Sequence, residues 1–182
     1  PAEELLDMSD KWVLSELART AAEVTANLDK YELGLAAEKV ENFIWDIYCD
    51  WYIEICKSRL NGEDAQQADT ARKVLVWVLD KALKLLHPFM PFITEEIYQA
   101  LPGSAETIMT QEWPDAGKMT AWPQECADFE VLMDYIKAVR TIRNDMNVHP
   151  AKKTSMTIET ANPAAFQKGG AYLARFAFAT DV

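Results

Sequence analysis

Histidine, cysteine and serine side chains are the usual agents of catalysis, and their spacing in this chain predicts none. His87 and His149 each stand directly before a proline at the end of an expected helix, which favours a polar helix-end role over acid–base work. The three cysteines, Cys49, Cys56 and Cys126, include no CxxC pair, and no His/Cys/acid spacing matches a zinc site. The sequence also contains no glycine-rich phosphate loop and no recognisable nucleophile motif. We therefore expect no catalytic residue, no metal and no cofactor in this chain.

Basic side chains offer a different chemistry, which is contact with phosphate. The chain as a whole has a net charge of −11, which by itself argues against a dedicated nucleic-acid binder. The stretch 137–153 is an exception, because its bases stand against Asp145 alone and give it a net charge of +4. These bases are Lys137, Arg140, Arg143, Lys152 and Lys153. A local basic patch of this kind can bind phosphate on an acidic protein.

Helices are expected to position these groups, because apolar residues recur at steps of three and four along most of the chain. In the first segment such steps join Leu14, Leu17, Ala21, Val24 and Leu28. The same spacing predicts helices over 10–31, 35–60, 69–87, 94–101 and 126–146. Breaks at Gly34, Asn61-Gly62 and Pro88 separate them, and Thr94 is a candidate cap for the short fourth helix.

The second of these helices carries an unusual number of aromatic residues. Its core stripe at helical spacing consists of Val40, Ile44, Ile47, Trp51 and Ile55. The run Trp45, Tyr48, Trp51 and Tyr52 leaves two interpretations open, because such side chains either fill a core or stack on nucleobases.

The C-terminal part changes character after residue 147. Residues 154–160 are β-prone and partly alternating, and Asn162-Pro163 is a good helix start for a segment reaching about residue 177. Residues 102–124 are expected to form a loop with short strand character at 107–110. We therefore predict a mainly α fold, with an antiparallel helix bundle over 1–147 and a small, truncated α/β appendage over 148–182.

The cellular setting follows from what the sequence lacks. There is no signal peptide at the start and no apolar run long enough to cross a membrane. The few unpaired cysteines suit a reducing compartment. We expect a cytoplasmic protein with no membrane partner.

Several ordered motifs resemble one known family. They are Asp10-Lys11-Trp12-Val13-Leu14-Ser15, Phe43-Ile44-Trp45-Asp46, Cys49-Asp50-Trp51-Tyr52-Ile53-Glu54, the run from Leu85 to Ile97 and the run from Ile142 to Lys153. Together these motifs resemble the anticodon-binding domain of the class I aminoacyl-tRNA synthetases for valine, isoleucine and leucine. The combination is more similar to the valine branch than to the other two, and the resemblance covers nearly the whole chain from about residue 8.

The resemblance implies a helix bundle that docks the anticodon stem-loop of tRNA-Val, with no DNA partner and with a monomeric chain. It also implies that the full-length ligase uses ATP with Mg²⁺. The catalytic signatures HIGH and KMSKS are absent, so this chain alone should not aminoacylate tRNA. An RNA loop offers splayed bases and phosphates, which basic and amide side chains at helix ends can reach. The candidate tRNA-binding residues are Lys11, Trp12, Lys57, Arg59, Asn61, Arg140, Arg143, Lys152 and Lys153.

Other interpretations remain open at this stage. Arg59 is the candidate for reading an anticodon base, whereas Arg143 either meets stem phosphates or forms a structural ion pair with Asp145 or with an acid on a neighbouring helix. The whole chain is alternatively a structural or protein-interaction module, a free-standing helical enzyme, or the same domain from the isoleucine or leucine branch.

Overall fold

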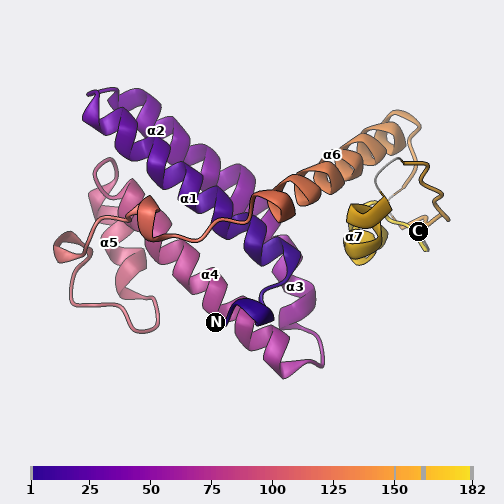
Figure 1. Ribbon diagram of the computed structural model, residues 1–182, viewed down its shortest axis with the longest axis horizontal. Helices are drawn as coiled ribbons and strands as arrows, with labels where there is room; N and C mark the ends of the chain where they lie inside the picture. Colours follow the sequence, from indigo (N-terminus) through magenta and orange to yellow (C-terminus); the bar gives the residue numbers. More distant parts are fainter. Residues whose placement is uncertain (1, 150, 161–162, 181–182) are drawn as a thin grey trace. The chain divides into compact units, whose positions relative to one another are not determined.

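Helices account for nearly all the regular structure, as the apolar spacing predicts. The computed structural model describes residues 2–149, 151–160 and 163–180 (Figure 1). It divides into two compact units, Pro1–Trp122 and Pro123–Val182. In the described part of the chain, no helix is long and apolar enough to cross a membrane.

The first unit is built on a helical hairpin. After a short 3-10 turn, η1 (Glu3–Leu5), helix α1 (Met8–Asp29) packs along α2 (Leu33–Asn42), which returns beside it (Figure 1). At the hairpin tip, Glu32 donates its N–H to the carbonyl of Asn27 at 2.8 Å, and Tyr31 adopts a left-handed backbone with φ of 62°. Glycine is the usual residue there, because a Cβ is strained in that conformation. Tyr31 nevertheless occupies it, with 89% of its surface exposed.

The helix expected over 35–60 is present, but its middle is wound more widely than an α-helix. Helix α2 continues directly into a π-helical stretch, η2 (Phe43–Ile53), and then into α3 (Glu54–Leu60). The wider winding moves the buried stripe onto Phe43, Tyr48 and Tyr52. The core stripe predicted from α-helical spacing is therefore wrong in the middle of the helix, where Trp51 is only partly buried.

Helix α4 (Ala65–Leu86) completes the bundle and contacts α1, α2 and α3. The Asp64 carboxylate caps it by accepting from the N–H groups of Gln66 and Gln67. Helix α5 (Pro91–Gln99) follows and starts at a proline, so the predicted Thr94 cap is wrong. Thr94 lies inside the helix, where its hydroxyl donates to the Met90 carbonyl.

The connection from α5 to the second unit is irregular. It contains two short 3-10 turns, η3 (Ile108–Thr110) and η4 (Ala116–Lys118). The strand character predicted at 107–110 is therefore not observed. Trp113 and Trp122 tie this connection to the N-terminal part of the unit, because their indole N–H groups donate to Thr25 at 2.9 Å and to Glu3 at 2.8 Å.

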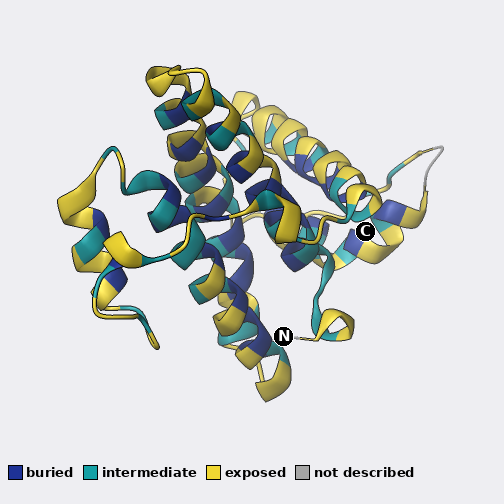
Figure 2. Cartoon of the chain, turned by 60° about the vertical axis from the view of Figure 1, so that its left-hand side comes forward, coloured by how far each residue is buried: buried dark blue, intermediate teal, exposed yellow. Residues whose placement is uncertain are grey.

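The core of the first unit lies between α1, η2, α3 and α4, whose inward sides are dark blue in Figure 2. Its largest fully buried side chains include Trp12, Leu17, Phe43, Tyr52, Ile55 and Leu85. Burying such side chains is the main stabilising contribution to a bundle of this size.

The second unit consists of α6 (Pro123–Asp145), α7 (Pro163–Phe176) and the segment between them. Its division from the first unit lies earlier than the boundary predicted at residue 148, because α6 packs on α7. Phe129 meets Tyr172 edge to face with ring centroids 5.3 Å apart. Gly169 permits this close approach, since a Cβ added there would lie 2.1 Å from a methyl carbon of Leu132.

The predicted α/β appendage is visible only in part. Among the residues that the structure describes, an isolated parallel bridge joins Thr154 to Ala179, and no longer strand is assigned. The mainly helical fold is confirmed, whereas the α/β character is not. The predicted cap at Asn162 falls outside the described residues.

Candidate tRNA-binding surface

The start of α1 is organised by two reciprocal hydrogen bonds. The Asp7 carboxylate accepts from the Asp10 N–H at 2.9 Å, and the Asp10 carboxylate accepts from the Asp7 N–H at 3.1 Å. This capping box satisfies N–H groups that have no partner within the helix. The Ser9 hydroxyl also donates to Asp7 at 2.7 Å. Two carboxylates are thus held in defined positions where the first helix begins.

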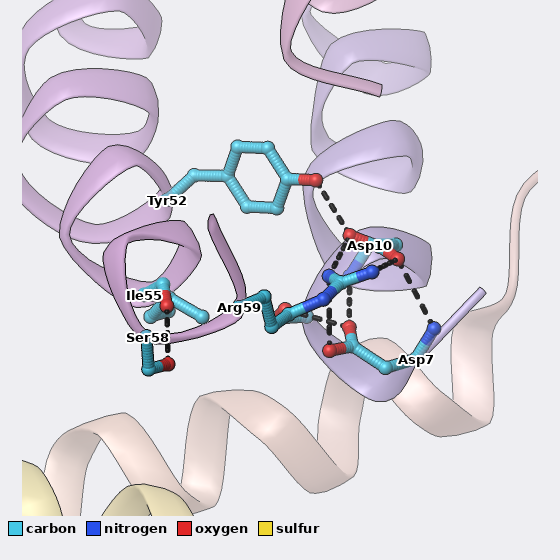
Figure 3. Close-up of polar contacts among 7 residues, drawn as sticks. Asp7, Asp10, Tyr52, Ile55, Ser58 and Arg59 are labelled. Carbon is cyan, nitrogen blue, oxygen red and sulfur yellow. Dashed lines mark hydrogen bonds and ion pairs between the residues drawn. The ribbon is translucent and has the colours of Figure 1, made fainter. Parts of the chain in front are cut away.

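Arg59, near the end of α3, binds both of these carboxylates (Figure 3). Its two terminal nitrogens donate to the two Asp10 oxygens at 2.6 and 2.9 Å, and one of them lies 3.0 Å from Asp7. The Tyr52 hydroxyl donates to Asp10 at 2.5 Å. The Arg59 side chain is 11% exposed and that of Asp10 is 0% exposed. Arg59 therefore acts inside the fold and joins α3 to α1.

The electrostatics of this cluster are those of a buried ion pair. Burial raises the pKa of the Asp10 carboxyl, although the hydrogen bonds from Arg59 and Tyr52 oppose that effect. Burial alone would lower the pKa of Arg59, but the hydrogen bond and charges of Asp10 and Asp7 raise it overall. The guanidinium therefore keeps its charge at every physiological pH. A bidentate pair of this kind is strongly directional, so it fixes how the two helix ends meet.

Two of the residues predicted to contact tRNA are therefore placed differently from the prediction. Arg59 directs its terminal nitrogens at Asp10 and Asp7, so reading an anticodon base would require breaking that pair. Trp12 is 2% exposed and belongs to the core, where an incoming base has no access to its ring. The geometry of both residues indicates a structural role.

The same pair brings other candidates to one end of the first unit. Lys57 and Asn61 flank Arg59 on the outside of α3 and are exposed, whereas Lys11 directly follows Asp10. Lys57 forms an exposed ion pair with Glu54, one turn earlier. The Lys11 ammonium lies 6.0 Å from the ring centre of Trp122. Basic and amide groups thus gather where α3 ends and α1 begins.

In the second unit, the two arginines of α6 are engaged with the C-terminal segment. Arg140 donates to the Phe176 carbonyl at 2.8 Å and lies over the rings of Phe176 and Phe178. Arg143 donates to the Lys152 carbonyl at 2.6 Å and, more weakly, to the His149 carbonyl at 3.3 Å. The predicted ion pair of Arg143 with Asp145 or a neighbouring acid is not found among the described residues; Arg143 instead clamps a loop through two carbonyl oxygens.

This clamp has a consequence for the two lysines beside it. Lys152 and Lys153 are exposed, and the carbonyl of Lys152 is held by Arg143. The two lysines are therefore exposed beside a backbone carbonyl that Arg143 holds. In the patch expected over 137–153, Lys137, Arg140, Lys152 and Lys153 are exposed, whereas Arg143 is half-buried.

The histidines lie near helix ends, and of the three cysteines only Cys56 is fully buried. His87 Nδ1 lies 2.7 Å from the Thr94 hydroxyl, and His149 Nδ1 accepts from the Ala151 N–H at 3.1 Å. Cys56 is buried and unpaired, and burial raises the pKa of its thiol to about 12. Both histidines therefore serve as polar groups near helix ends.

Sequence reasoning missed Asp7 and Asp10 as partners of Arg59, and Tyr52 as a donor to Asp10. The sequence identifies Asp10 only as a candidate helix cap, because capping depends on neighbouring residues. The pair with Arg59 joins residues 49 positions apart, so local sequence gives no sign of it.

Comparison with known proteins places this geometry in context. A family model described as "Anticodon-binding domain of tRNA ligase" matches residues 10–158. Similar proteins include "Valine--tRNA ligase" from Bacillus cereus (strain ATCC 10987 / NRS 248) and from Geobacillus stearothermophilus, each 42% identical over 172 residues. Each match covers 93% of this chain and 20% of the relative. The protein of the same name from Staphylococcus epidermidis is 44% identical over 155 residues, covering 85% of this chain and 18% of the relative. The chain thus spans about a fifth of the length of the curated relatives it matches.

Proposed function

Since this chain belongs to the family of anticodon-binding domains of tRNA ligases, we propose that it binds the anticodon stem-loop of tRNA-Val. The relatives named above are valine--tRNA ligases, which favours the valine branch over the isoleucine and leucine branches. On this proposal the chain is one module of a longer, cytoplasmic and monomeric ligase that joins valine to tRNA-Val. ATP and Mg²⁺ would be bound by other parts of that enzyme.

The observation that carries the proposal is the exposed end of α3, which Arg59 ties to the start of α1. Lys57 supplies a positive charge for a phosphate, and the Asn61 side-chain amide supplies both a donor and an acceptor for a base edge. Because the buried pair holds this helix end in place, little ordering cost remains when RNA binds. Lys11 lies at the same end of the unit.

Lys152 and Lys153 form a second proposed contact with the RNA. They project from the loop clamped by Arg143, in a stretch with a net charge of +4. Contacts from lysine to phosphate position an RNA without reading its sequence. We assign these two lysines to the stem, and Lys57 and Asn61 to the loop.

The α/β character of the C-terminal segment is also part of the proposal. Thr154 and Ala179 form a parallel bridge, Thr180 donates its N–H to the Thr154 carbonyl at 3.0 Å, and α7 lies between the two residues in the chain. A parallel pair connected by a helix is the arrangement of a βαβ unit. This pattern supports a small α/β subdomain.

Single-lysine variants test the proposal in a salt titration of binding to an RNA hairpin with the tRNA-Val anticodon stem-loop sequence. Lys57→Ala and Lys152→Ala should each weaken binding and lower the salt slope by about 1, since each removes one phosphate contact. Lys73→Ala is the matched control, because Lys73 is similarly exposed and also ion-paired within its own helix, and it lines a pocket with Tyr98 and Leu101. Equal slopes for all three variants would overturn the placement of the site.

A further inference from the structure

Helix α3 ends at a dipeptide that combines a thermolabile residue with an unhindered neighbour. Asn61 caps the end of the helix and is the only asparagine in the sequence that is followed directly by a glycine. Both residues are exposed, as are the four residues after them. Within the described part of the chain, no group forms a hydrogen bond with the Asn61 side-chain amide. Asparagine is among the least durable residues in warm water, so this exposed pair is a candidate for chemical modification.

The modification that an asparagine–glycine pair undergoes is an internal cyclisation. The backbone nitrogen of the glycine loses its proton and attacks the side-chain carbonyl carbon of the asparagine. A carbon–nitrogen bond closes a five-membered imide, and the bond to the side-chain nitrogen breaks, so that this nitrogen takes up a proton and leaves as ammonia. Water then opens the imide at either carbonyl and yields aspartate or isoaspartate. Glycine favours the attack because it has no Cβ to shield its nitrogen, and both reacting groups belong to one chain.

The backbone at Asn61 has to rotate before this ring can close. Its ψ is 2°, whereas closure requires the Gly62 nitrogen to turn toward the Asn61 side chain. The Gly62 N–H donates to the Arg59 carbonyl and so opposes the rotation, but at 3.3 Å this hydrogen bond is long. Helix ends open at little cost in free energy. The exposed end of α3 therefore gives access to the reactive conformation.

The other asparagines that the structure describes are held more firmly. Three of them lie inside helices α1, α2 and α6, where the following N–H is engaged in the helix: Asn27, Asn42 and Asn144. Asn147 is exposed, but the next residue is Val148, whose branched side chain shields its nitrogen. The Val148 N–H also donates to the Arg143 carbonyl at 2.8 Å. Asn61 thus differs from them in both sequence and setting.

We propose that Asn61 is a site of spontaneous deamidation, and that this reaction lowers the affinity of the chain for RNA. The second part rests on the proposed function, in which Lys57 and Asn61 meet the anticodon loop. Deamidation replaces an amide that donates and accepts by a carboxylate that only accepts. The new negative charge lies one helical turn after Lys57, whose carbonyl accepts from the Asn61 N–H at 3.2 Å. It repels phosphate and competes with it for the Lys57 ammonium.

Peptide mapping by mass spectrometry tests the site on the aged 182-residue chain. The chain is incubated at mildly alkaline pH, and the conversion of each asparagine is measured from the mass change between amide and carboxyl. Asn61 should convert at least about tenfold faster than Asn147, the exposed reference, because only glycine leaves the attacking nitrogen unshielded. Mildly acidic pH should slow the conversion, since the attacking nitrogen has to lose its proton. Equal rates at the two asparagines would overturn the proposed site.

Asn61→Gln is the matched control for this measurement. It keeps an uncharged amide at the helix end, but its longer side chain has to close a larger ring, so the acidic form seen by ion-exchange chromatography should no longer accumulate. Gly62→Ala is a poorer control, because a Cβ there would lie 3.0 Å from the Ser58 carbonyl oxygen. An acidic form that accumulates equally fast in Asn61→Gln would place the reaction elsewhere and contradict the proposal.

Freshly prepared Asn61→Asp, which carries the aspartate product, tests the consequence for RNA. At low salt it should bind the hairpin with the tRNA-Val anticodon stem-loop sequence about tenfold more weakly than fresh Asn61→Gln, the loss that one base-edge contact accounts for. Equal affinities of the two variants would overturn the effect on RNA binding. If the unmodified chain does not bind the hairpin, the proposed function fails together with that effect, whereas the peptide mapping decides the deamidation site independently.

Discussion

Replacing Arg59 by alanine should destabilise the first unit without directly removing an RNA contact. The substitution deletes the two hydrogen bonds to Asp10 and the ion pair with Asp7. Asp10, which is 0% exposed, would be left with only the Tyr52 hydroxyl and the Asp7 N–H as partners. The predicted effect is therefore on the free energy of unfolding.

The magnitude follows from the burial of the pair. Removing one partner of a buried ion pair typically costs 3–5 kcal/mol, and the 11% exposure of Arg59 places this case near the lower limit, at about 3 kcal/mol. Replacing both partners, with Asp10→Asn and Arg59→Met, should cost less than Arg59→Ala alone, because no buried charge is then left unpaired. At low pH the cost of Arg59→Ala should shrink, since a protonated Asp10 needs no counter-charge.

Urea unfolding followed by tryptophan fluorescence is the appropriate assay. All six tryptophans lie before residue 123, so their emission reports on the first unit alone. With a urea dependence of about 1.5 kcal/mol per molar, a loss of about 3 kcal/mol lowers the midpoint by roughly 2 M. Lys57→Ala is the matched control, since this exposed neighbour should change stability by less than about 0.5 kcal/mol.

A particular pair of results would refute this reasoning. If Arg59→Ala changes stability by less than about 1 kcal/mol yet abolishes the preference for a valine anticodon, Arg59 faces RNA and the buried pair has little energetic weight. The original base-reading hypothesis for Arg59 would then be restored.

Four further substitutions test local features of the fold. Gly169→Ala should destabilise the second unit by about 1–3 kcal/mol, because its Cβ would meet Leu132. Gly170→Ala has open space around it and should stabilise the same helix by up to about 1 kcal/mol. Thermal unfolding followed by circular dichroism compares the two variants, and equal effects would contradict the close contact. Tyr31→Gly should raise stability by about 0.5–1 kcal/mol in urea unfolding by relieving the left-handed backbone, and a loss would mean that the side chain contributes packing there. The Cys56 thiol has a pKa of about 12 in the folded protein against 9.0 for an ordinary thiol, so between pH 9 and 12 it keeps a proton that the unfolded chain loses. The free energy of unfolding should therefore fall by up to about 1.4 kcal/mol per pH unit across that pH range, and Cys56→Ala should reduce this fall. An unchanged pH dependence of stability in Cys56→Ala would contradict the buried thiol.

The helices of this protein were largely predictable because their apolar stripes are regular. Helices α1, α4 and α6 begin and end within a few residues of the expected bounds. The π-helical winding of η2 was not predictable, since wide and normal turns place nearly the same residues inward over one or two turns. Only over several turns does the difference move the core from Trp51 to Tyr52.

The sequence correctly indicated several exposed basic side chains but not the buried setting of Arg59 and Trp12, and the tRNA site itself stays a prediction. The exposed lysines Lys57, Lys152 and Lys153 stand where the sequence suggested accessible bases. The burial of Arg59 depends on a partner 49 residues away, and that of Trp12 depends on which side of α1 faces the bundle. Composition and spacing along one helix carry no information about such long-range contacts.

Binding of the 182-residue chain to tRNA-Val, compared with the same tRNA carrying a non-valine anticodon, tests the central proposal most directly. We predict saturable, salt-dependent binding to tRNA-Val at low ionic strength. The anticodon change should weaken it by about tenfold, the effect of losing a base-edge contact worth about 1–3 kcal/mol. Equal affinity for the two RNAs across the salt titration, or no saturable binding to either, would contradict the assignment of this chain as an anticodon-binding module.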